Sequence, residues 1–484
     1  MYPVAPPVDG QDWLNTRPIG LGSLRGNVVV VVFWSFGCEA SLLRVRQVEA
    51  MAADPNVPLR AIAVHTPRFP YEESTEAVRD AVAQHHIQIP VVNDPGYETW
   101  NAYNPEGWPA TVVINARGRV LGTQGGSGDV EVLRETIALG LQTVDSPTVD
   151  PAAVNEPSES SSTQTSAIAS ITGPATVERL PLPDGDLAFP TSVAILGTGE
   201  LIVADYGNDR LLAFRLSADM RRATALAEIG GFDRPYGLLA DGYDGLYVTE
   251  PAVGSVSYLD LRAKSRRLLT EDLVAPTGLA LDSDESVVVA DSGSEQLYRL
   301  INEGPHTVTM GLIAGSGVSG SHDGSAADAD LAQPTGLART EVGVVFCDAA
   351  ASNVRLLTDS GKVATITGNG FFDWGLVDGP AHKAKLQRPS DLAVLDDGSI
   401  VIVDTGNNRL RRLTGRRIRT LGLAGLKRPT GICRTDSGQL IVADTGNSRL
   451  VVIDADLQTA RPLRLDGVLP AARDVAGSRE RDLV

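Results

Sequence analysis

The sequence predicts two domains of different fold class, an α/β domain followed by an all-β propeller with six blades. Two observations support this prediction. In the first part of the chain, apolar runs of strand length alternate with segments of helix length, which is typical of an α/β fold. In the second part, one sequence pattern recurs six times at the length of a four-stranded propeller blade. A chain of 484 residues is also too long for one ordinary hydrophobic core.

The elements of the first domain follow from the apolar pattern. The run NVVVVVFW at residues 27–34 is rich in β-branched residues, which suits a strand buried on both faces. A helix is expected over Glu39–Met51, where apolar residues recur at helical spacing. The further predicted elements are a strand at 59–64, a helix at 75–85, strands at 90–92, 111–114 and 120–123, and a helix at 130–142. We assign residues 1–145 to this domain.

A segment of different composition separates the two domains. Residues 146–175 contain SPTVDPAAVNEPSESSSTQTSAIAS, in which Ser, Thr, Pro and Glu dominate and aromatic residues are absent. Such a segment cannot bury enough apolar surface to offset its ordering entropy, so we expect a disordered linker. The propeller is then expected at residues 176–470, followed by a tail at 471–484.

Six related segments make up the second domain. Each starts at a proline and contains two apolar strands joined by a tight turn, then an acidic residue and a glycine-rich turn. The prolines are Pro190, Pro235, Pro276, Pro334, Pro389 and Pro429, at intervals of 45, 41, 58, 55 and 40 residues. A four-stranded blade takes roughly 40–45 residues. The two longer intervals therefore indicate expanded loops at residues 314–331 and 367–386.

These segments resemble NHL repeats. The match is strong at residues 201–211, 400–410 and 440–450, each of which ends in Asp-x-Gly-Asn-x-Arg-Leu. Two repeats depart from it, since Glu250 stands in place of the aspartate and no glycine follows Asp348 by two residues. The resemblance implies a propeller with short polar turns after each second strand.

The first domain resembles the TlpA-like thioredoxins. The similarity rests on FWSFGC at residues 33–38, NDPGYETWNAY at 93–103 and GWPATVVINARGRV at 107–120. The order of the two parts is similar to that of a family in which a TlpA-like thioredoxin domain precedes an NHL propeller. The resemblance covers nearly the whole chain apart from the linker and the last residues.

Cys38 is the first candidate for chemistry. It follows a predicted buried strand and begins a predicted helix, where backbone N–H groups and the helix dipole stabilise a thiolate. The resemblance places Cys38 at the attacking cysteine of a Cys-x-x-Cys pair, but Ser41 stands at the second cysteine position. A hydrolase or lyase function of the propeller has the least support from the sequence, and two other hypotheses remain open. One is a monothiol redox protein resolved by an external thiol, and the other is a non-catalytic scaffold in which both domains only bind.

The resemblance adds two residues to the candidate site. Trp108 and Pro109 match the cis-proline segment of thioredoxins, which faces the active cysteine in that family. We therefore expect a cis bond at this position, and Cys38, Ser41, Trp108 and Pro109 form the candidate catalytic set. His65 follows a predicted strand and is expected to be a hydrogen-bonded structural histidine.

The propeller is expected to bind a protein partner on the face that carries both expanded loops. The second loop contains Phe371, Phe372 and Trp374, and aromatic residues on exposed loops are enriched at binding hot spots. The alternative is that these side chains fold back over a blade edge. The repeated aspartates are expected to tie the turn that follows each of them to its blade through side-chain to backbone hydrogen bonds. They are Asp205, Asp291, Asp348, Asp404 and Asp444.

Composition excludes several function classes. The formal net charge is −18 and no region is basic, so nucleic acid and anionic membranes are not expected partners. The three cysteines, Cys38, Cys347 and Cys433, do not form a disulfide framework, and the start of the chain lacks the features of a signal peptide. We therefore expect a cytoplasmic monomer. No cofactor and no metal site are expected, because the histidines of the repeats fall in loops.

Overall fold

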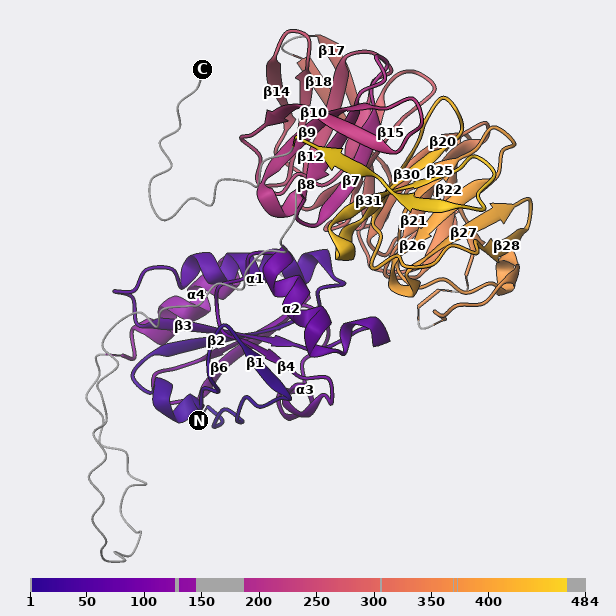
Figure 1. Cartoon of the computed structure of the whole chain (residues 1–484). Coiled ribbons are helices and arrows are strands. Elements are labelled where there is room, and N and C mark those ends of the chain that lie inside the picture. Colours follow the sequence, from indigo (N-terminus) through magenta and orange to yellow (C-terminus); the bar gives the residue numbers. More distant parts are fainter. Residues whose placement is uncertain are drawn as a thin grey trace, which may run out of the picture. The chain divides into compact units, whose positions relative to one another are not determined.

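The computed structural model describes residues 2–126, 130–144, 187–304, 307–368, 370–371 and 373–467. The chain forms two compact units, Met1–Leu180 and Pro181–Val484, and each is described here by itself (Figure 1). The predicted linker at residues 146–175 and the predicted tail at 471–484 lie outside the described residues.

The first unit contains one six-stranded mixed sheet with helices on both faces. The strand order is β1-β4-β3-β2-β5-β6, with β2, β3 and β4 parallel to one another. The strands are β1 (Asp12–Leu14), β2 (Val28–Trp34), β3 (Leu59–His65), β4 (Val91–Asn93), β5 (Ala110–Ile114) and β6 (Val120–Gly125). The helices are α1 (Glu39–Met51), α2 (Thr75–Gln84), α3 (Glu98–Tyr103) and α4 (Val130–Leu141).

The strand β2 serves two cores because successive side chains of a strand point to opposite faces. Val30 and Val32 belong to the cluster that includes residues of α1, α2 and α4. Val31 and Phe33 belong to a second cluster on the other face, against which Trp100 of α3 packs. This double burial explains the uninterrupted apolar run, and it fixes the position of the residues that follow β2.

One short strand and one short α-helix of this unit were not predicted. The helix α1 has the predicted bounds, and the other predicted strands and helices, β2 included, differ from the structure by one or two residues. The strand β1 has three residues and no apolar alternation. The helix α3 has six residues, and its N-cap Tyr97 has a left-handed conformation without a capping side chain. Asp94 replaces the usual cap, since its carboxylate accepts hydrogen bonds from the backbone N–H groups of Thr99 and Trp100.

The second unit is the predicted six-bladed propeller, with sheets of four or five strands. The first three blades comprise β7 (Pro190–Ile195), β8 (Leu201–Asp205), β9 (Arg210–Leu216) and β10 (Arg222–Ile229); β11 (Leu238–Ala240), β12 (Gly245–Glu250), β13 (Ser255–Asp260) and β14 (Ser265–Thr270); and β15 (Pro276–Leu281), β16 (Val287–Asp291), β17 (Gln296–Gly304) and β18 (Thr307–Ala314).

The other three blades have the same organisation. They comprise β20 (Pro334–Thr340), β21 (Gly343–Asp348), β22 (Asn353–Thr358) and β23 (Lys362–Thr367); β25 (Pro389–Val394), β26 (Ile400–Asp404), β27 (Arg409–Thr414) and β28 (Arg417–Thr420); and β29 (Gly431–Arg434), β30 (Leu440–Asp444), β31 (Arg449–Ile453) and β32 (Ala460–Pro462). Within each blade the first strand named is innermost.

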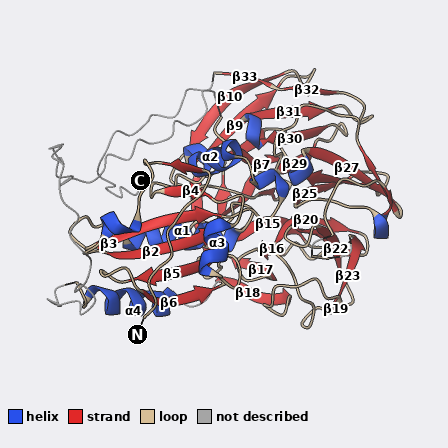
Figure 2. Cartoon of the chain, turned by 90° about the horizontal axis from the view of Figure 1, so that it is seen from below, coloured by secondary structure: helices blue, strands red, loops and turns tan. Residues whose placement is uncertain are grey.

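Three blades gain an additional outer strand. The strands β19 (Gly324–Ser325) and β24 (Gly379–Pro380) belong to the two expanded loops and pair with β23 and β28, the outer strands of the fourth and fifth blades. The strand β33 (Arg464–Asp466) pairs in parallel with β10 of the first blade (Figure 2). The end of the described chain is therefore attached to the blade where the propeller begins.

The repeated acidic residues join each blade's second strand to the entry of its first strand. In every blade one side-chain oxygen accepts a backbone N–H of the segment before the innermost strand. Asp205 accepts from Ala188 at 2.7 Å, and Glu250, which replaces the aspartate of the second repeat, accepts from Asp233 at 2.7 Å. The other acceptors are Asp291, Asp348, Asp404 and Asp444. A structural role through side-chain to backbone hydrogen bonds is confirmed, but the segment held is not the expected one. The sequence analysis expected the following turn, whereas these bonds hold the segment before the innermost strand. In three blades the following turn is reached through side-chain amides, of Asn208, Asn407 and Asn447.

A ring of hydroxyl groups links each innermost strand to the next blade. Thr191 donates to the Tyr236 carbonyl at 2.9 Å, and Thr430 donates to the Thr191 carbonyl at 2.8 Å, which closes the ring between the last and first blades. The other donors are Thr249, Thr277, Thr335 and Ser390. Five of these six residues directly follow the proline that begins their repeat. In the second repeat Tyr236 follows the proline, and Thr249 donates the hydrogen bond instead.

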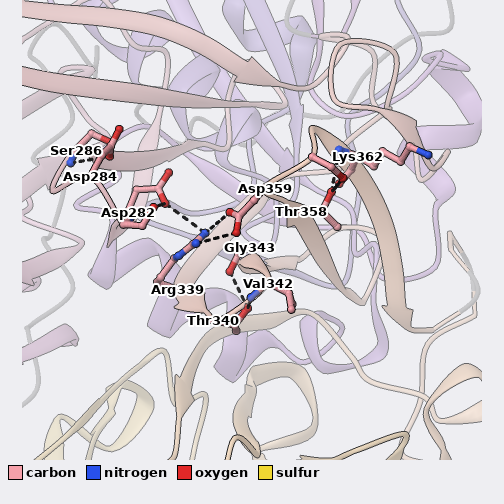
Figure 3. A network of polar contacts seen from close by, with 12 residues as sticks. Asp282, Asp284, Ser286, Arg339, Thr340, Val342, Gly343, Thr358, Asp359 and Lys362 are labelled. Carbon is pink, nitrogen blue, oxygen red and sulfur yellow. Dashed lines mark hydrogen bonds and ion pairs between the residues drawn. The ribbon is translucent and has the colours of Figure 1, made fainter.

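An ion-pair network joins the third and fourth blades (Figure 3). The guanidinium of Arg339 contacts Asp282 at 3.3 Å and binds both carboxylate oxygens of Asp359, at 2.5 and 2.9 Å. Arg299 also pairs with Asp282 and with Asp284. The participating turns follow the first and third strands of their blades, so the network lies on the face opposite the glycine-rich turns. The network thus connects surface turns of two neighbouring blades.

Candidate functional site

Cys38 occupies the N-cap position of α1, immediately after the loop that leaves β2. Its backbone is extended, with φ −131° and ψ 109°, and its carbonyl accepts the first helical hydrogen bond from Leu42 at 3.1 Å. The side chain is 2% exposed. Ser41 lies in the first turn of α1 and is fully buried, and its hydroxyl has no hydrogen-bond partner among the described residues. Cys38 therefore lies at the start of a helix, as the sequence predicted.

The loop before Cys38 is fixed by a buried carboxylate that the sequence analysis missed. Glu72 is fully buried, and its Oε2 accepts hydrogen bonds from the Ser35 hydroxyl at 2.7 Å and from the Arg68 backbone at 2.9 Å. The Ser35 hydroxyl in turn accepts from the Gly37 N–H at 3.2 Å. A Cβ at Gly37 would come within 2.0 Å of Glu72 Oε1, so a larger residue there would displace the Glu72 carboxylate. The sequence alone could not identify Glu72 as the buried carboxylate, because an identical residue, Glu73, stands next to it.

The Trp108–Pro109 bond is cis, as the resemblance predicted. Ala110 pairs with Phe33 in the antiparallel β2–β5 ladder, so Pro109 lies at the end of the sheet where β2 leads to Cys38. The Trp108 indole N–H donates to the Thr66 carbonyl at 3.0 Å, just beyond β3. Three segments therefore meet at one end of the sheet, and together they bring the four candidate residues to one region.

His65 ends β3 within the same region and is a buried, neutral histidine. Burial lowers the pKa of His65 to about 4, while its hydrogen bond to Asn93 acts in the opposite direction. Asn93 Nδ2 donates to the Glu73 carbonyl at 3.0 Å, so Asn93 Oδ1 is the acceptor and His65 Nδ1 carries the proton. Phe36 stacks on the imidazole with centroids 5.2 Å apart. The expected hydrogen-bonded structural histidine is found.

In the propeller, each expanded loop is anchored by a fully buried arginine. Arg355 binds Asp348 of its own blade at 2.9 Å and the loop residue Asp323 at 2.8 Å. Arg411 repeats the arrangement with Asp404 at 2.7 Å and Asp378 at 2.8 Å. Both arginines stand seven positions after the repeat aspartate, a spacing that could have marked the blades with expanded loops. Both loops share the face of the glycine-rich turns.

The predicted partner-binding aromatics are less exposed than the sequence suggested. Phe371 is half-buried and packs against Ala332, Ala350 and Ala351, while Trp374 is also half-buried. The next residue, Gly375, donates its N–H to the Leu386 carbonyl at 2.9 Å, so the loop doubles back on itself. Phe372 lies outside the described residues. Partner binding through these residues stays a prediction.

The remaining cysteines lie in strands of the propeller. Burial raises the pKa of Cys433 to about 12 and the pKa of Cys347 well above its ordinary value. None of the three cysteines is in a disulfide. Within the described ranges, no group of three or more His, Cys, Asp or Glu side chains is arranged to hold a metal ion. In the same part of the chain, no helix has the length and apolarity needed to cross a membrane.

Comparison with known proteins gives relatives for most of the chain and for a shorter segment of it. The NHL repeat family matches residues 386–413 and 426–453, the fifth and sixth repeats. SUPPRESSOR OF QUENCHING 1 of Arabidopsis thaliana is 24% identical over 86% of this chain and 42% of the plant protein. NHL repeat-containing protein 2 of Gallus gallus is 25% identical over 85% of this chain and 62% of the chicken protein.

A third relative matches a shorter segment of 124 residues. Protein DipZ of Mycobacterium bovis is 36% identical over 25% of this chain and 18% of the mycobacterial protein. The chain therefore spans less than two thirds of the length of each of these relatives. It is similar to NHL repeat-containing protein 2 along most of its own length and combines a thioredoxin-like domain with a six-bladed NHL-repeat propeller.

Proposed function

We propose that this chain is a monothiol redox or thiol-dependent binding protein whose propeller binds a protein partner. The observation that carries the proposal is the position of Cys38 at the N-terminus of α1, at the same end of the sheet as Pro109. Backbone N–H groups and the helix dipole stabilise a thiolate there, and the thiolate is the nucleophilic form of cysteine. A reducing compartment such as the cytoplasm, also part of the proposal, would maintain this thiol.

In the proposed reaction, the Cys38 thiolate attacks one sulfur of a substrate disulfide. A bond forms between Cys38 Sγ and that sulfur, the substrate S–S bond breaks, and the second sulfur leaves as a thiolate that takes up a proton. Ser41 has no thiol with which to resolve this mixed disulfide. An external thiolate therefore attacks the substrate sulfur, forms a disulfide with it and releases Cys38 as a thiolate.

The alternative is a scaffold in which both domains only bind. The 2% exposure of Cys38 favours this alternative, because a substrate sulfur must reach the thiol. The absence of a second cysteine at Ser41 favours it as well. In that case the region of Trp108 and Pro109 would serve as a binding surface without sulfur chemistry.

Trapping of mixed disulfides in cell extract separates the two functions. Native protein should form adducts that a reductant releases, and Cys38→Ala should form none. Cys433→Ala is the matched control and should behave as native, because the raised pKa of Cys433 keeps it protonated. Equal trapping by native protein and Cys38→Ala would contradict the redox proposal and leave the scaffold.

The propeller half of the proposal is tested separately. Trp374→Ala combined with Phe372→Ala should abolish capture of the partner without changing the melting temperature. Tyr243→Ala is a suitable control, because Tyr243 is 78% exposed in the β11–β12 turn on the opposite face. A large fall in melting temperature with capture intact would show that the two aromatics only pack the loop.

A further inference from the structure

The end of the sheet that contains Cys38 also contains a positively charged side chain, Arg68. Its guanidinium carbon lies 5.8 Å from the centroid of the Trp108 ring and 5.9 Å from that of Phe69. The Trp108 ring is itself stacked on Trp100 at 4.1 Å. Cation–π contacts of this kind hold a guanidinium in place while leaving its N–H groups able to donate.

The backbone of Arg68 is linked to the loop that precedes Cys38. Its N–H donates to Glu72 Oε2, which also accepts from Ser35, and the Ser35 hydroxyl accepts from the N–H of Gly37. Gly37 is the residue directly before Cys38. Because Glu72 is fully buried, this chain of hydrogen bonds fixes Arg68 relative to the cysteine loop.

No carboxylate among the described residues forms an ion pair with the Arg68 guanidinium. The side chain is half-buried and forms no ion pair within the part of the chain that the structure describes. Its Glu72 contact is made by the backbone. Residues 1–145 contain ten arginines, no lysine and sixteen acidic residues, so the domain as a whole repels anions. Arg68 is therefore a cation beside the cis-proline segment that has no ion-pair partner among the described residues, in a domain whose net charge is negative.

We propose that Arg68 is a specificity-determining residue that selects ligands with an anionic group, such as a carboxylate, next to the sulfur or peptide presented to Cys38. This inference rests on the proposed function, because its first test measures the reaction of Cys38 with a disulfide. The guanidinium would donate to the carboxylate, while the ring of Trp108 holds it in the orientation needed for that contact.

The test compares two disulfide probes on the full chain. Dithiobis(nitrobenzoate) carries a carboxylate on each half, whereas dithiodipyridine is neutral at pH 7.5. Cys38 Sγ forms a bond with one probe sulfur, and the other half leaves as a coloured thiolate or thione. Arg68→Gln should lower the rate with the anionic probe about fivefold at low salt and leave the neutral probe nearly unchanged. High salt should reduce the difference.

Two controls separate charge from structure and from reactivity. Arg117→Gln removes the same charge from the exposed β5–β6 turn, at the other end of the sheet, and should change neither rate. Cys38→Ala gives the background of the other two cysteines. The inference would be overturned if Arg68→Gln lowered the reaction rate equally with both probes, or left the ratio of the two rates unchanged.

A binding measurement distinguishes failure of the inference from failure of the proposed function. In Cys38→Ala, tryptophan fluorescence titrated with glutathione disulfide, which carries carboxylates, should report tighter binding than cystamine, which carries amines. Adding Arg68→Gln should remove this preference. If native Cys38 reacts with neither probe but the binding preference depends on Arg68, the redox function fails and the anionic specificity holds. Absence of the preference overturns the specificity itself.

Discussion

His65 shows how burial alone sets the state of a titratable group in the thioredoxin-like domain. The ring is fully buried and its pKa is lowered to about 4, chiefly by desolvation. Phe36 and Trp34 surround it with aromatic rings, which cannot stabilise an added proton as water does. The imidazole is therefore neutral throughout the physiological pH range, and the domain is expected to be sensitive to acid at this position.

The stability of the domain should fall as pH decreases from about 6.5 toward 4. In this window the unfolded histidine binds a proton and the native one does not, so protons favour the unfolded state, by at most about 3 kcal/mol. His65→Gln should flatten this part of the stability curve. Unfolding followed by tryptophan fluorescence checks it, with His382→Gln, an exposed propeller residue, as control. The same pH slope in native protein and His65→Gln would contradict the assignment.

Ser41 tests whether the Cys38 region retains the geometry of a dithiol site. Its buried hydroxyl has no partner among the described residues, so replacing it with a thiol costs no hydrogen bond. Ser41→Cys should form a disulfide with Cys38 under mild oxidation and should gain insulin-reducing activity, because the second sulfur can resolve the adduct internally. Mass spectrometry detects the disulfide, and Ser41→Ala is the matched control. Failure of the two thiols to pair would show a different arrangement.

At the scale of single elements, the buried arginines Arg355 and Arg411 hold two long loops that contain little regular secondary structure. Each is fully buried and connects a repeat aspartate with a loop aspartate, and the following two loop residues then form an added strand. A loop of this length gains order only if its polar backbone groups find partners. Here Arg411 also donates to the carbonyls of Lys385 and Val377, at 2.9 and 3.0 Å.

Arg411→Met should lower the stability of the propeller by about 3–5 kcal/mol, because it leaves Asp404 buried without its cationic partner. The neighbouring Arg412→Met is the control. Arg412 lies on the same strand but pairs with Asp397, which is 53% exposed, so its loss should cost at most about 1 kcal/mol. Thermal unfolding of the two variants measures the difference. Similar melting temperatures would show that Arg411 does not anchor the loop.

The elements that sequence could predict are those set by periodic burial. The run at residues 27–34 and the helix Glu39–Met51 were recognisable because apolar residues recur at strand and helix periods. The six repeats likewise identified the propeller. Glu72 was not recognisable, because its importance depends on its contact with the Ser35 hydroxyl, which is distant in sequence. The hydrogen bonds between blades were missed for the same reason.

For the propeller as a whole, closure depends on contacts between the two ends of the repeat region. Thr430 and Thr445 of the last repeat donate hydrogen bonds to the carbonyls of Thr191 and Pro190 in the first blade. The strand β33 then adds a parallel strand to β10. The hydroxyl contacts act at the innermost strands, whereas β33 acts at the outer edge. The two kinds of contact should therefore differ in importance for the stability of the ring.

Two truncations of the full chain separate these contributions. A chain ending at residue 463 loses β33 but keeps all innermost strands, so it should still unfold cooperatively, at a lower temperature. A chain ending at residue 427 also loses the sixth blade, and the apolar faces of the first and fifth blades, which pack against it, become exposed to water. Its propeller should not unfold cooperatively. Circular dichroism at the wavelength of β structure follows both, and a cooperatively melting, soluble chain ending at residue 427 would contradict closure as one ring of six blades.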